Sequence, residues 1–414
     1  MQPPSSPAAS LPPPTPTPQG TGFTRWVMLL GFLTAVAPLS IDMYLPGFPQ
    51  MEKSLNGAPG SIEFTLATFF IGLALGQLLY GPLSDRFGRK PPLYLGFALY
   101  TVASVGCALA ESVDALCVWR FLQAMGGCAG IVVPSAIVRD RMGARDSARV
   151  FSLLMLVMGL APILAPLVGG WLLEGWGWRA IFWVLTGFGL LCLAFVAWGL
   201  GESHATEHEP PLRLGTVMGN YAGLLGNRSY LGFALSGGLV RAGMFAYIAG
   251  SPFILIHLYE LSPRQYGWFF GANAFGLIAC SQINAQLLKK SPPTTLLRRA
   301  LWVPLLSSLF LSVMALAGWI SLTWFAVGFF VFIASVGMVG PNANAAALAT
   351  HGQMAGTAAA LNGSLAFALA TLAGALVGAL HNGTGQPLAL VMLLCGLGAW
   401  LSHRFLVRPA PQHG

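Results

Sequence analysis

Charged side chains are scarce in this sequence. Asp, Glu, Lys and Arg make up only 8% of its 414 residues, whereas soluble domains usually contain about 25%. Because so few charges cannot cover a soluble surface, we expect neither a soluble enzyme nor a protein with nucleic acid as its partner. Hydrophobic residues reach 55%, and the mean hydropathy is +0.69. These values predict an all-α integral membrane protein that is embedded in the lipid bilayer.

Several signatures of chemistry are also missing. No two of the six cysteines form a C-x-x-C pair, so neither a disulfide framework nor a metal site is indicated. The phosphate-binding Walker sequence is absent, which gives no support to ATP as the energy source. A nucleophile with a partnered base is not recognisable either. We therefore expect no cofactor, no metal and no enzymatic activity.

Apolar stretches of about 20 residues recur along the chain, and each is long enough to cross a bilayer. They predict twelve transmembrane helices at about 25–47, 62–83, 91–110, 114–138, 149–172, 180–200, 229–256, 264–288, 298–317, 319–341, 354–379 and 386–406. The longest break separates six spans from six. The expected organisation is a disordered Pro-rich tail (1–24), an N-terminal half (25–200), a cytoplasmic linker (201–228), a C-terminal half (229–406) and a short tail (407–414).

The basic residues predict the orientation in the membrane. Sixteen of the 21 Lys and Arg residues fall in loops on one side, and only Lys53, Arg179 and Arg264 fall on the other. Loops rich in Lys and Arg stay in the cytoplasm. The pattern therefore predicts a multi-pass protein of the inner (plasma) membrane with both termini in the cytoplasm.

Two loop and helix motifs carry a family resemblance. Residues 81–90 read GPLSDRFGRK, which resembles the G-x-L-x-D-R-x-G-R-K signature of the major facilitator superfamily. Residues 161–170 read APILAPLVGG and resemble the motif of its drug:proton antiporters, with alanines at two positions where glycines are usual. Segments 41–46 (IDMYLP) and 243–253 (GMFAYIAGSPF) are similar to the Bcr/CflA branch of multidrug exporters.

The resemblance implies twelve helices in two six-helix bundles around a central cavity, with alternating access and a proton gradient as the driving force. Contacts between the bundles would come from the second, fifth, eighth and eleventh helices. The resemblance also implies a conformational switch formed by the two motifs: Gly81, Asp85, Arg86, Gly88, Arg89, Pro162, Pro166, Gly169 and Gly170.

Asp42 is the only acidic residue well inside a predicted span. A buried ion is costly in a membrane, so such a residue is a functional candidate. Counted along their helices, Asp42 and Arg120 lie at similar depths below the outer surface, which predicts an ion pair or coupled titration through water. We expect this pair to couple transport to protons, with a structural clamp as the alternative role for Arg120 and a helix-end carboxylate as the alternative for Asp42.

Arg241 lies near the middle of the seventh span, with Phe245 one turn further on. It is expected to contact substrate or to tune Asp42, and the alternative is a structural pairing with backbone carbonyls or water. Gln123 and Asn273 supply polar groups, and tyrosines and phenylalanines suit an apolar drug cavity, although each of these could simply pack between helices. The candidate substrate-binding residues are Tyr44, Gln123, Arg241, Phe245, Tyr247 and Asn273.

The function that these observations favour is secondary active export of small amphipathic drugs in exchange for protons, by a monomer. Export or symport of a metabolite such as an amino acid remains the alternative within transport. A membrane enzyme would need clustered His, Asp or Glu residues, and a channel would not need a protonatable residue, so both are less favoured.

Overall fold

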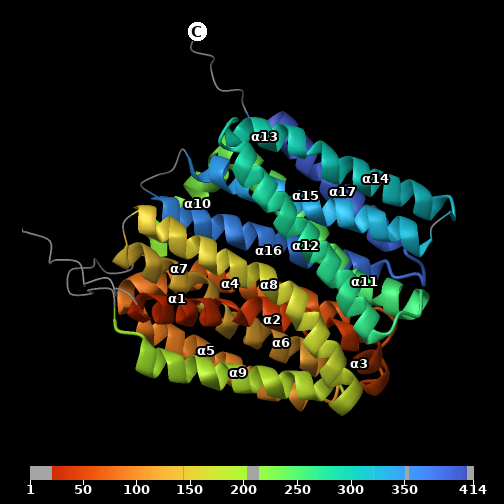
Figure 1. Ribbon diagram of the computed structural model, residues 1–414, viewed down its shortest axis with the longest axis horizontal. Helices are drawn as coiled ribbons and strands as arrows, with labels where there is room; N and C mark the ends of the chain where they lie inside the picture. The colour runs from red at the N-terminus through yellow and green to blue at the C-terminus, as the bar shows by residue number, and fades with distance from the viewer. Residues whose placement is uncertain (1–20, 143, 203–213, 320, 350–353, 408–414) are drawn as a thin grey trace, which may run out of the picture.

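The computed structural model describes residues 21–142, 144–202, 214–319, 321–349 and 354–407. All regular elements in these ranges are helices (Figure 1). The Pro-rich tail predicted at 1–24 lies outside the described residues except for its last four, and so do most of the residues predicted as the C-terminal tail.

The two halves of the chain each build a group of membrane-length helices. The N-terminal half contains α1 (Thr21–Thr34), α2 (Val36–Asp42), η1 (Leu45–Gly47), α3 (Phe48–Ser54), α4 (Glu63–Phe87), α5 (Lys90–Ala108), α6 (Val113–Gly127), α7 (Ala129–Arg141), α8 (Ala144–Trp176) and α9 (Trp178–Gly199). The C-terminal half contains α11 (Arg228–Pro252), η2 (Phe253–Leu258), α12 (Pro263–Leu287), α13 (Pro293–Ala300), α14 (Trp302–Leu316), α15 (Leu322–Leu348), α16 (Ala355–Ala379) and α17 (Gln386–Leu406).

Twelve crossings result because several of these elements follow one another in a single span. In the part of the chain that the structure describes, ten helical stretches are long and apolar enough to cross a membrane by length and composition, and α8 and α12 are the two further long helices. The all-helical class and the twelve spans are therefore confirmed. The sequence did not indicate α10 (Leu214–Gly226), a separate helix within the stretch expected to be a linker.

The first span was expected to be one helix over 25–47, but prolines divide it. A proline has no N–H group and clashes with the carbonyl four residues earlier, so the helix breaks there. Pro38 stands four residues after Thr34, where α1 ends, and Pro46 stands four residues after Asp42, where α2 ends. The backbone therefore leaves its regular helix immediately after the buried carboxylate, and η1 and α3 continue the chain as far as Ser54.

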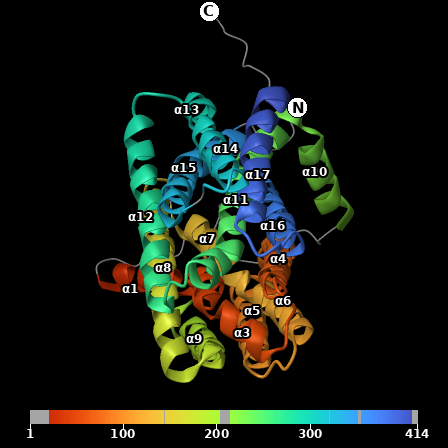
Figure 2. The same cartoon turned by 90° about the vertical axis from the view of Figure 1, so that its right-hand side faces the viewer.

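The two halves meet along a seam formed by two helix pairs. Helix α4 packs against α16, and α8 packs against α12, which are the second, eleventh, fifth and eighth spans that the resemblance implied. Figure 2 shows the two halves as separate groups, one below and one above this seam. Glycines of α12 and α16 meet the seam: Gly267 and Gly271 lie against Leu167 and Ile163 of α8, and Gly378 lies against Glu63 and Phe64 of α4.

The seam is closed at one end of the molecule. We call this the closed end; it contains η1, α3 and η2. Here η1 contacts α11 and α12, and α3 contacts η2. Gly60, just before α4, also lies against His381 at the end of α16. Helices α8 and α12 meet near this end and diverge toward the other, as Figure 1 shows.

Candidate functional site

Asp42 lies at the last turn of α2, beside the seam between the halves. Its side chain is 3% exposed, and its Oδ1 atom has no hydrogen-bond partner among the described residues. Such an oxygen is costly to bury when the carboxylate is ionised, and far less so when the group carries a proton. Asp42 is therefore in a position to bind a proton in this conformation.

Polar groups of the C-terminal half lie close to Asp42. Asp42 lies close enough to Tyr247 on α11 and Tyr266 on α12 to act on both electrostatically. The Tyr247 hydroxyl accepts a hydrogen bond from Asn273 Nδ2 at 2.8 Å, and Ser251 Oγ and the Tyr266 hydroxyl are 3.1 Å apart. The structure thus brings Asp42, Tyr247 and Asn273 to one region, although they were predicted separately. A charge on Asp42 would be felt directly by helices of the opposite half.

Arg120 does not form the expected ion pair with Asp42 in this conformation. Its Nη2 donates to the backbone carbonyl of Ser40 at 2.9 Å, and its Nη1 donates to Gln123 Oε1 at 2.5 Å. The guanidinium lies between the rings of Tyr44 and Phe69, 4.1 Å from each centroid. These contacts join α6 to α2 and α4. They fit the alternative considered above, a structural clamp.

The polar side chains of α6 are buried inside the N-terminal half rather than open to a cavity. Arg120 and Gln123 are both 0% exposed. Gln123 Nε2 donates to Ser104 Oγ on α5 at 2.8 Å. Tyr44 is equally buried, and its hydroxyl is 3.3 Å from Thr65 Oγ1. In this conformation, none of the three reaches a space that could hold a substrate.

Arg241 lies midway along α11 and keeps some accessible surface. Its guanidinium is beside Gly340 on α15, and it makes no hydrogen bond or ion pair with the residues that the structure describes. Phe245, one turn further on, does not stack on this guanidinium. Phe245 instead packs against Phe70 and Phe367, with centroid distances of 4.4 and 5.7 Å, and so forms part of the seam.

The GPLSDRFGRK motif is held together by a buried arginine. Arg89 donates to Asp85 at 2.6 Å through Nη1, and to Asp140 at the end of α7 at 2.7 and 3.1 Å through Nε and Nη2. Burial alone would lower the pKa of Arg89, but the hydrogen bonds to Asp140 and Asp85 outweigh it and raise that pKa. Glu202 accepts the backbone N–H groups of Arg89 and Lys90 at 2.8 and 3.1 Å, next to the N-terminus of α5.

Two partners in this network, Asp140 and Glu202, were missed by the sequence analysis. Both lie far from the motif in the chain, and neither stands in a recognisable pattern. Gly88 has a φ of +85°, a conformation that glycine adopts without strain. It allows the chain to turn between α4 and α5, so that Arg89 points back toward Asp85.

The network predicts unequal effects for its two aspartates. Asp140→Asn should destabilise the protein by about 1.5–3 kcal/mol, since Asp140 accepts two charge-assisted bonds and its side chain is only 19% exposed. Asp85→Asn should cost about 1 kcal/mol or less, because the Asp85 side chain is 61% exposed. Denaturant unfolding of the two variants in detergent micelles measures this difference. Equal losses of stability would contradict the geometry.

The motif on α8 lies at the closed end of the seam. Gly169 is so close to the backbone of Met43, just after α2, that a side chain there would collide with the Met43 carbonyl. The neighbouring Gly170 faces Pro263 at the start of α12, across the seam. Pro162 and Pro166 both lie inside α8. The motif thus lies where α8 touches both the Asp42 region and the opposite half.

Comparison with known proteins shows what the chain is similar to. The profile that describes the Major Facilitator Superfamily matches residues 30–375. An uncharacterized MFS-type transporter of Bacillus subtilis, YdgK, is 34% identical over 379 residues, which cover 91% of this chain and 94% of that protein. A bicyclomycin resistance protein homolog of Haemophilus influenzae is 33% identical over 381 residues, with 92% and 96% covered. A chloramphenicol resistance protein of Pseudomonas aeruginosa is 31% identical over 340 residues, with 80% and 76% covered.

Solved transporter structures share the same fold. A D-xylose–proton symporter superposes with a TM-score of 0.69 at 16% identity and covers 94% of this chain and 98% of its own. A bacterial homolog of the human lysosomal transporter Spinster, inward-facing and occupied, gives a TM-score of 0.70 at 15% identity and covers 95% and 100%. At such low identity the likeness concerns the fold alone.

Proposed function

Because this chain belongs to the Major Facilitator Superfamily, we propose that it is a secondary active transporter that exports small amphipathic drugs in exchange for protons. The drug part of the proposal is supported by relatives that are named for resistance to bicyclomycin and to chloramphenicol. The observation that carries the proton part is Asp42, a buried carboxylate with an unpartnered oxygen at the seam between the moving halves.

The proposed cycle has the protein in the inner membrane as a monomer, with both termini in the cytoplasm and no cofactor. In this orientation the closed end faces outward. Asp42 would take up a proton when the outer side opens, keep it in the outward-closed conformation described here, and release it to the cytoplasm when a drug binds. Its charge acts on Tyr247 and Tyr266 of the opposite half, so gain or loss of the proton changes the stability of the contact between the halves.

The switch residues would act on the same equilibrium from outside the substrate site. Pro162, Pro166, Gly169 and Gly170 would control how α8 packs at the closed end. Gly81, Asp85, Arg86, Gly88 and Arg89 would hold α4, α5 and α7 together as one rigid unit at the other end. Proton coupling would belong to Asp42, with Arg120 positioning α2 through its bond to Ser40. Of the candidate substrate residues, Phe245 lies at the seam, Tyr247 and Asn273 lie in the Asp42 region, and Arg241 keeps some accessible surface, while Tyr44 and Gln123 would support the clamp.

The experiment that tests this function is transport by the purified protein in proteoliposomes, with chloramphenicol as the probe. An acidic interior should drive chloramphenicol into the vesicles, because protons leaving down their gradient exchange for the drug. An alkaline interior should not. Accumulation only with an alkaline interior would show symport, and accumulation independent of the gradient would show that proton exchange is not the driving force.

Arg241 makes a prediction about substrate charge. It is the one cation deep in α11 and has no partner among the described residues, whereas Arg120 is enclosed within the N-terminal half. A monovalent cation about 6 Å from an unpaired positive charge is repelled by about 3 kcal/mol at an effective dielectric constant of 20, which is about 100-fold in affinity. Wild type should therefore export neutral drugs better than lipophilic cations.

Arg241→Ala should gain resistance to cationic dyes in an efflux-deficient host. Arg228→Ala is the matched control, because Arg228 is exposed at the first turn of the same helix. Dye resistance that is unchanged in Arg241→Ala, in a strain that still resists chloramphenicol, would place this guanidinium outside the substrate site.

A further inference from the structure

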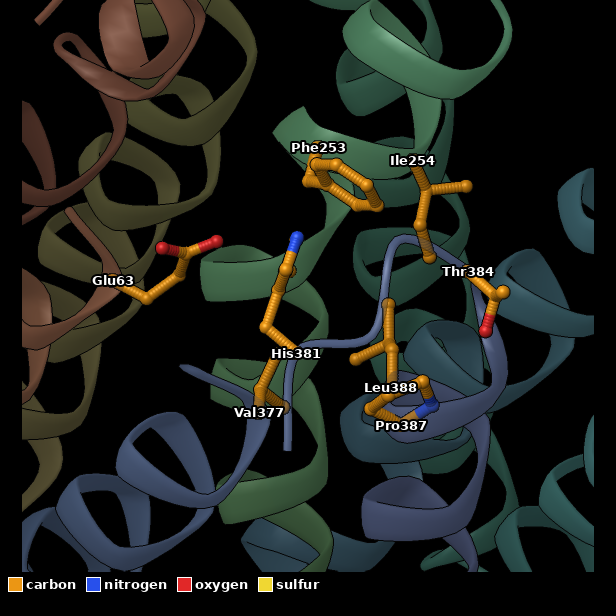
Figure 3. Close-up of a pocket in the computed structure, with 9 residues that line it drawn as sticks. Glu63, Phe253, Ile254, Val377, His381, Thr384, Pro387 and Leu388 are labelled. Atoms are coloured by element: carbon orange, nitrogen blue, oxygen red, sulfur yellow. The ribbon is translucent and has the colours of Figure 1, made fainter. Parts of the chain in front are cut away.

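Two small adjoining cavities lie at the closed end, between the halves. One is lined by Glu63, Phe253 and His381, and the other by Glu63, Phe253, Glu52 and His257, so Glu63 and Phe253 are common to both. Figure 3 shows Glu63 and His381 approaching the first cavity from opposite sides, with Phe253 beside them. The carboxylates come from the N-terminal half and the imidazoles from the C-terminal half.

Glu63 is a buried carboxylate that lacks a full set of partners. It is the first residue of α4 and is 4% exposed, and its Oε2 atom has no hydrogen-bond partner among the described residues. The N-terminus of a helix favours an ionised carboxylate, whereas burial of an unpartnered oxygen favours the protonated form. A group under these two opposing influences responds to a change in its exposure by gaining or losing a proton.

Three other titratable groups face Glu63 from the elements packed around it. Glu52 on α3 accepts the backbone N–H of Gly60 at 3.1 Å. His257 in η2 and His381 after α16 lie on two sides of the Phe253 ring, at centroid distances of 5.2 and 4.3 Å. Of the charged residues nearby, Lys53, Asp114 and Glu260 are exposed.

His381 does not offer a fixed positive charge to neutralise Glu63. Burial lowers the pKa of His381, and the neighbouring His257 lowers it further. Both effects favour the neutral form of this imidazole. Protonation of His381 would favour a more exposed environment and hence separation of the halves, whereas protonation of Glu63 would favour burial and closure. The two groups predict opposite responses to acid.

We propose that Glu63 is a second proton-binding site, on the outer face of the transporter, and that its protonation stabilises the closed outer end. The inference rests on the proposed orientation and on alternating access. When the contact between α4 and α16 opens, Glu63 becomes exposed and loses its proton to the outer medium. When the contact closes, it recovers a proton from the same side. Glu63 therefore carries no net proton across the membrane, but makes closure depend on external pH.

The test measures how far apart the two halves lie at the closed end, in the full chain in lipid nanodiscs. Spin labels at Glu111→Cys and Trp319→Cys, both exposed positions at this end, report the distance by pulsed electron paramagnetic resonance. The partly exposed Cys117 and Cys280 are replaced by serine. All proteins carry Asp42→Asn, so that titration of Asp42 does not contribute.

With Glu63 intact, the ratio of open to closed outer ends should rise with pH, by up to about tenfold per pH unit, the limit for one coupled proton. Glu63→Gln, which resembles the protonated side chain, should stay closed and lose this dependence. Glu174→Gln is the matched control, since Glu174 is an exposed glutamate near the same end and should leave the dependence unchanged. Glu63→Asp, which keeps a carboxylate, should also retain a pH dependence.

A pH dependence that survives in Glu63→Gln would overturn the proposal. The proposal would also be overturned if acid opened the outer end and this opening disappeared in His381→Gln, since the histidine would then be the pH sensor. A Glu63→Gln protein that does not fold would leave Glu63→Asp to decide, and loss of the pH dependence in that variant would also count against the proposal. None of these measurements requires transport. The proposal about Glu63 can therefore be contradicted while the liposome experiment supports drug–proton exchange, and the reverse.

Discussion

Asp42→Asn is expected to abolish accumulation of drug against its gradient while leaving the fold intact. Asparagine resembles the protonated carboxyl group in shape but cannot release a proton. The exchange would then lose its energy source, which is about 1.4 kcal/mol per pH unit and about 2.3 kcal/mol per 100 mV for each proton. We expect at least a 100-fold loss of gradient-driven chloramphenicol uptake in proteoliposomes, with downhill exchange of drug for drug preserved.

The control for this variant is Asp114→Asn, which makes the same substitution at an exposed aspartate in the first turn of α6. It should transport like wild type. Gradient-driven accumulation that persists in Asp42→Asn would remove Asp42 from the coupling mechanism. Loss of both driven and drug-for-drug exchange would show that the residue has a role in binding or folding instead.

Arg120→Ala is expected to lower the free energy of unfolding by about 3–5 kcal/mol and to reduce transport accordingly. The substitution would remove the N–H donors to the Ser40 carbonyl and to Gln123 Oε1, and would leave a void beside the Tyr44 and Phe69 rings. Arg120→Lys should restore only part of this stability, because lysine lacks the planar group that stacks on both rings. Denaturant unfolding in detergent micelles measures both variants.

Arg179→Ala is the matched control for Arg120. Arg179 is exposed, and its guanidinium stacks on Trp178 at 4.2 Å and donates to the Ala110 carbonyl at 3.0 Å, so its loss should cost about 1–2 kcal/mol, less than that of Arg120. The pH profile of transport separates the clamp from an ion pair with Asp42. It should be unchanged in Arg120→Lys. A profile displaced in any Arg120 variant that folds would show that the arginine acts on Asp42 after all.

The sequence was sufficient to predict the class, the number of spans and the helices of the seam. Length and apolar composition decide whether a segment crosses a bilayer, and the motif resemblance supplied the arrangement. The interruption of the first span was less predictable. Pro38 and Pro46 allow a break, but only the packing of η1 on α11 and α12 shows where the chain continues.

The expected pairing of Asp42 with Arg120 shows where sequence reasoning stops. Counting residues along two helices gives their depth in the membrane but not the direction in which each side chain points around its helix. Arg120 points toward Tyr44, Phe69 and the Ser40 carbonyl within its own half. Asp42 instead lies near Tyr247 and Tyr266 of the other half. Two residues can lie at the same depth in the membrane while their side chains point in different directions.

Contacts between distant segments were missed for the same reason. The bond of Arg89 to Asp140 joins residues that are 51 positions apart, and no spacing in the sequence marks it. Glu63 was not among the residues that the sequence singled out, and its neighbours His257 and His381 belong to the other half of the chain. Residues that meet only across the seam share no spacing or motif that a single sequence would reveal.

In the proposed cycle, binding of the drug displaces the proton from Asp42. Measuring proton release on drug binding tests this coupling most directly. Chloramphenicol is added to the purified transporter in a weakly buffered solution at a pH low enough for Asp42 to carry its proton, and the change in pH is recorded. Wild type should release about one proton per bound drug molecule, and Asp42→Asn should bind the drug and release none. Equal proton release from both proteins, or drug binding to wild type without any release, would contradict the account.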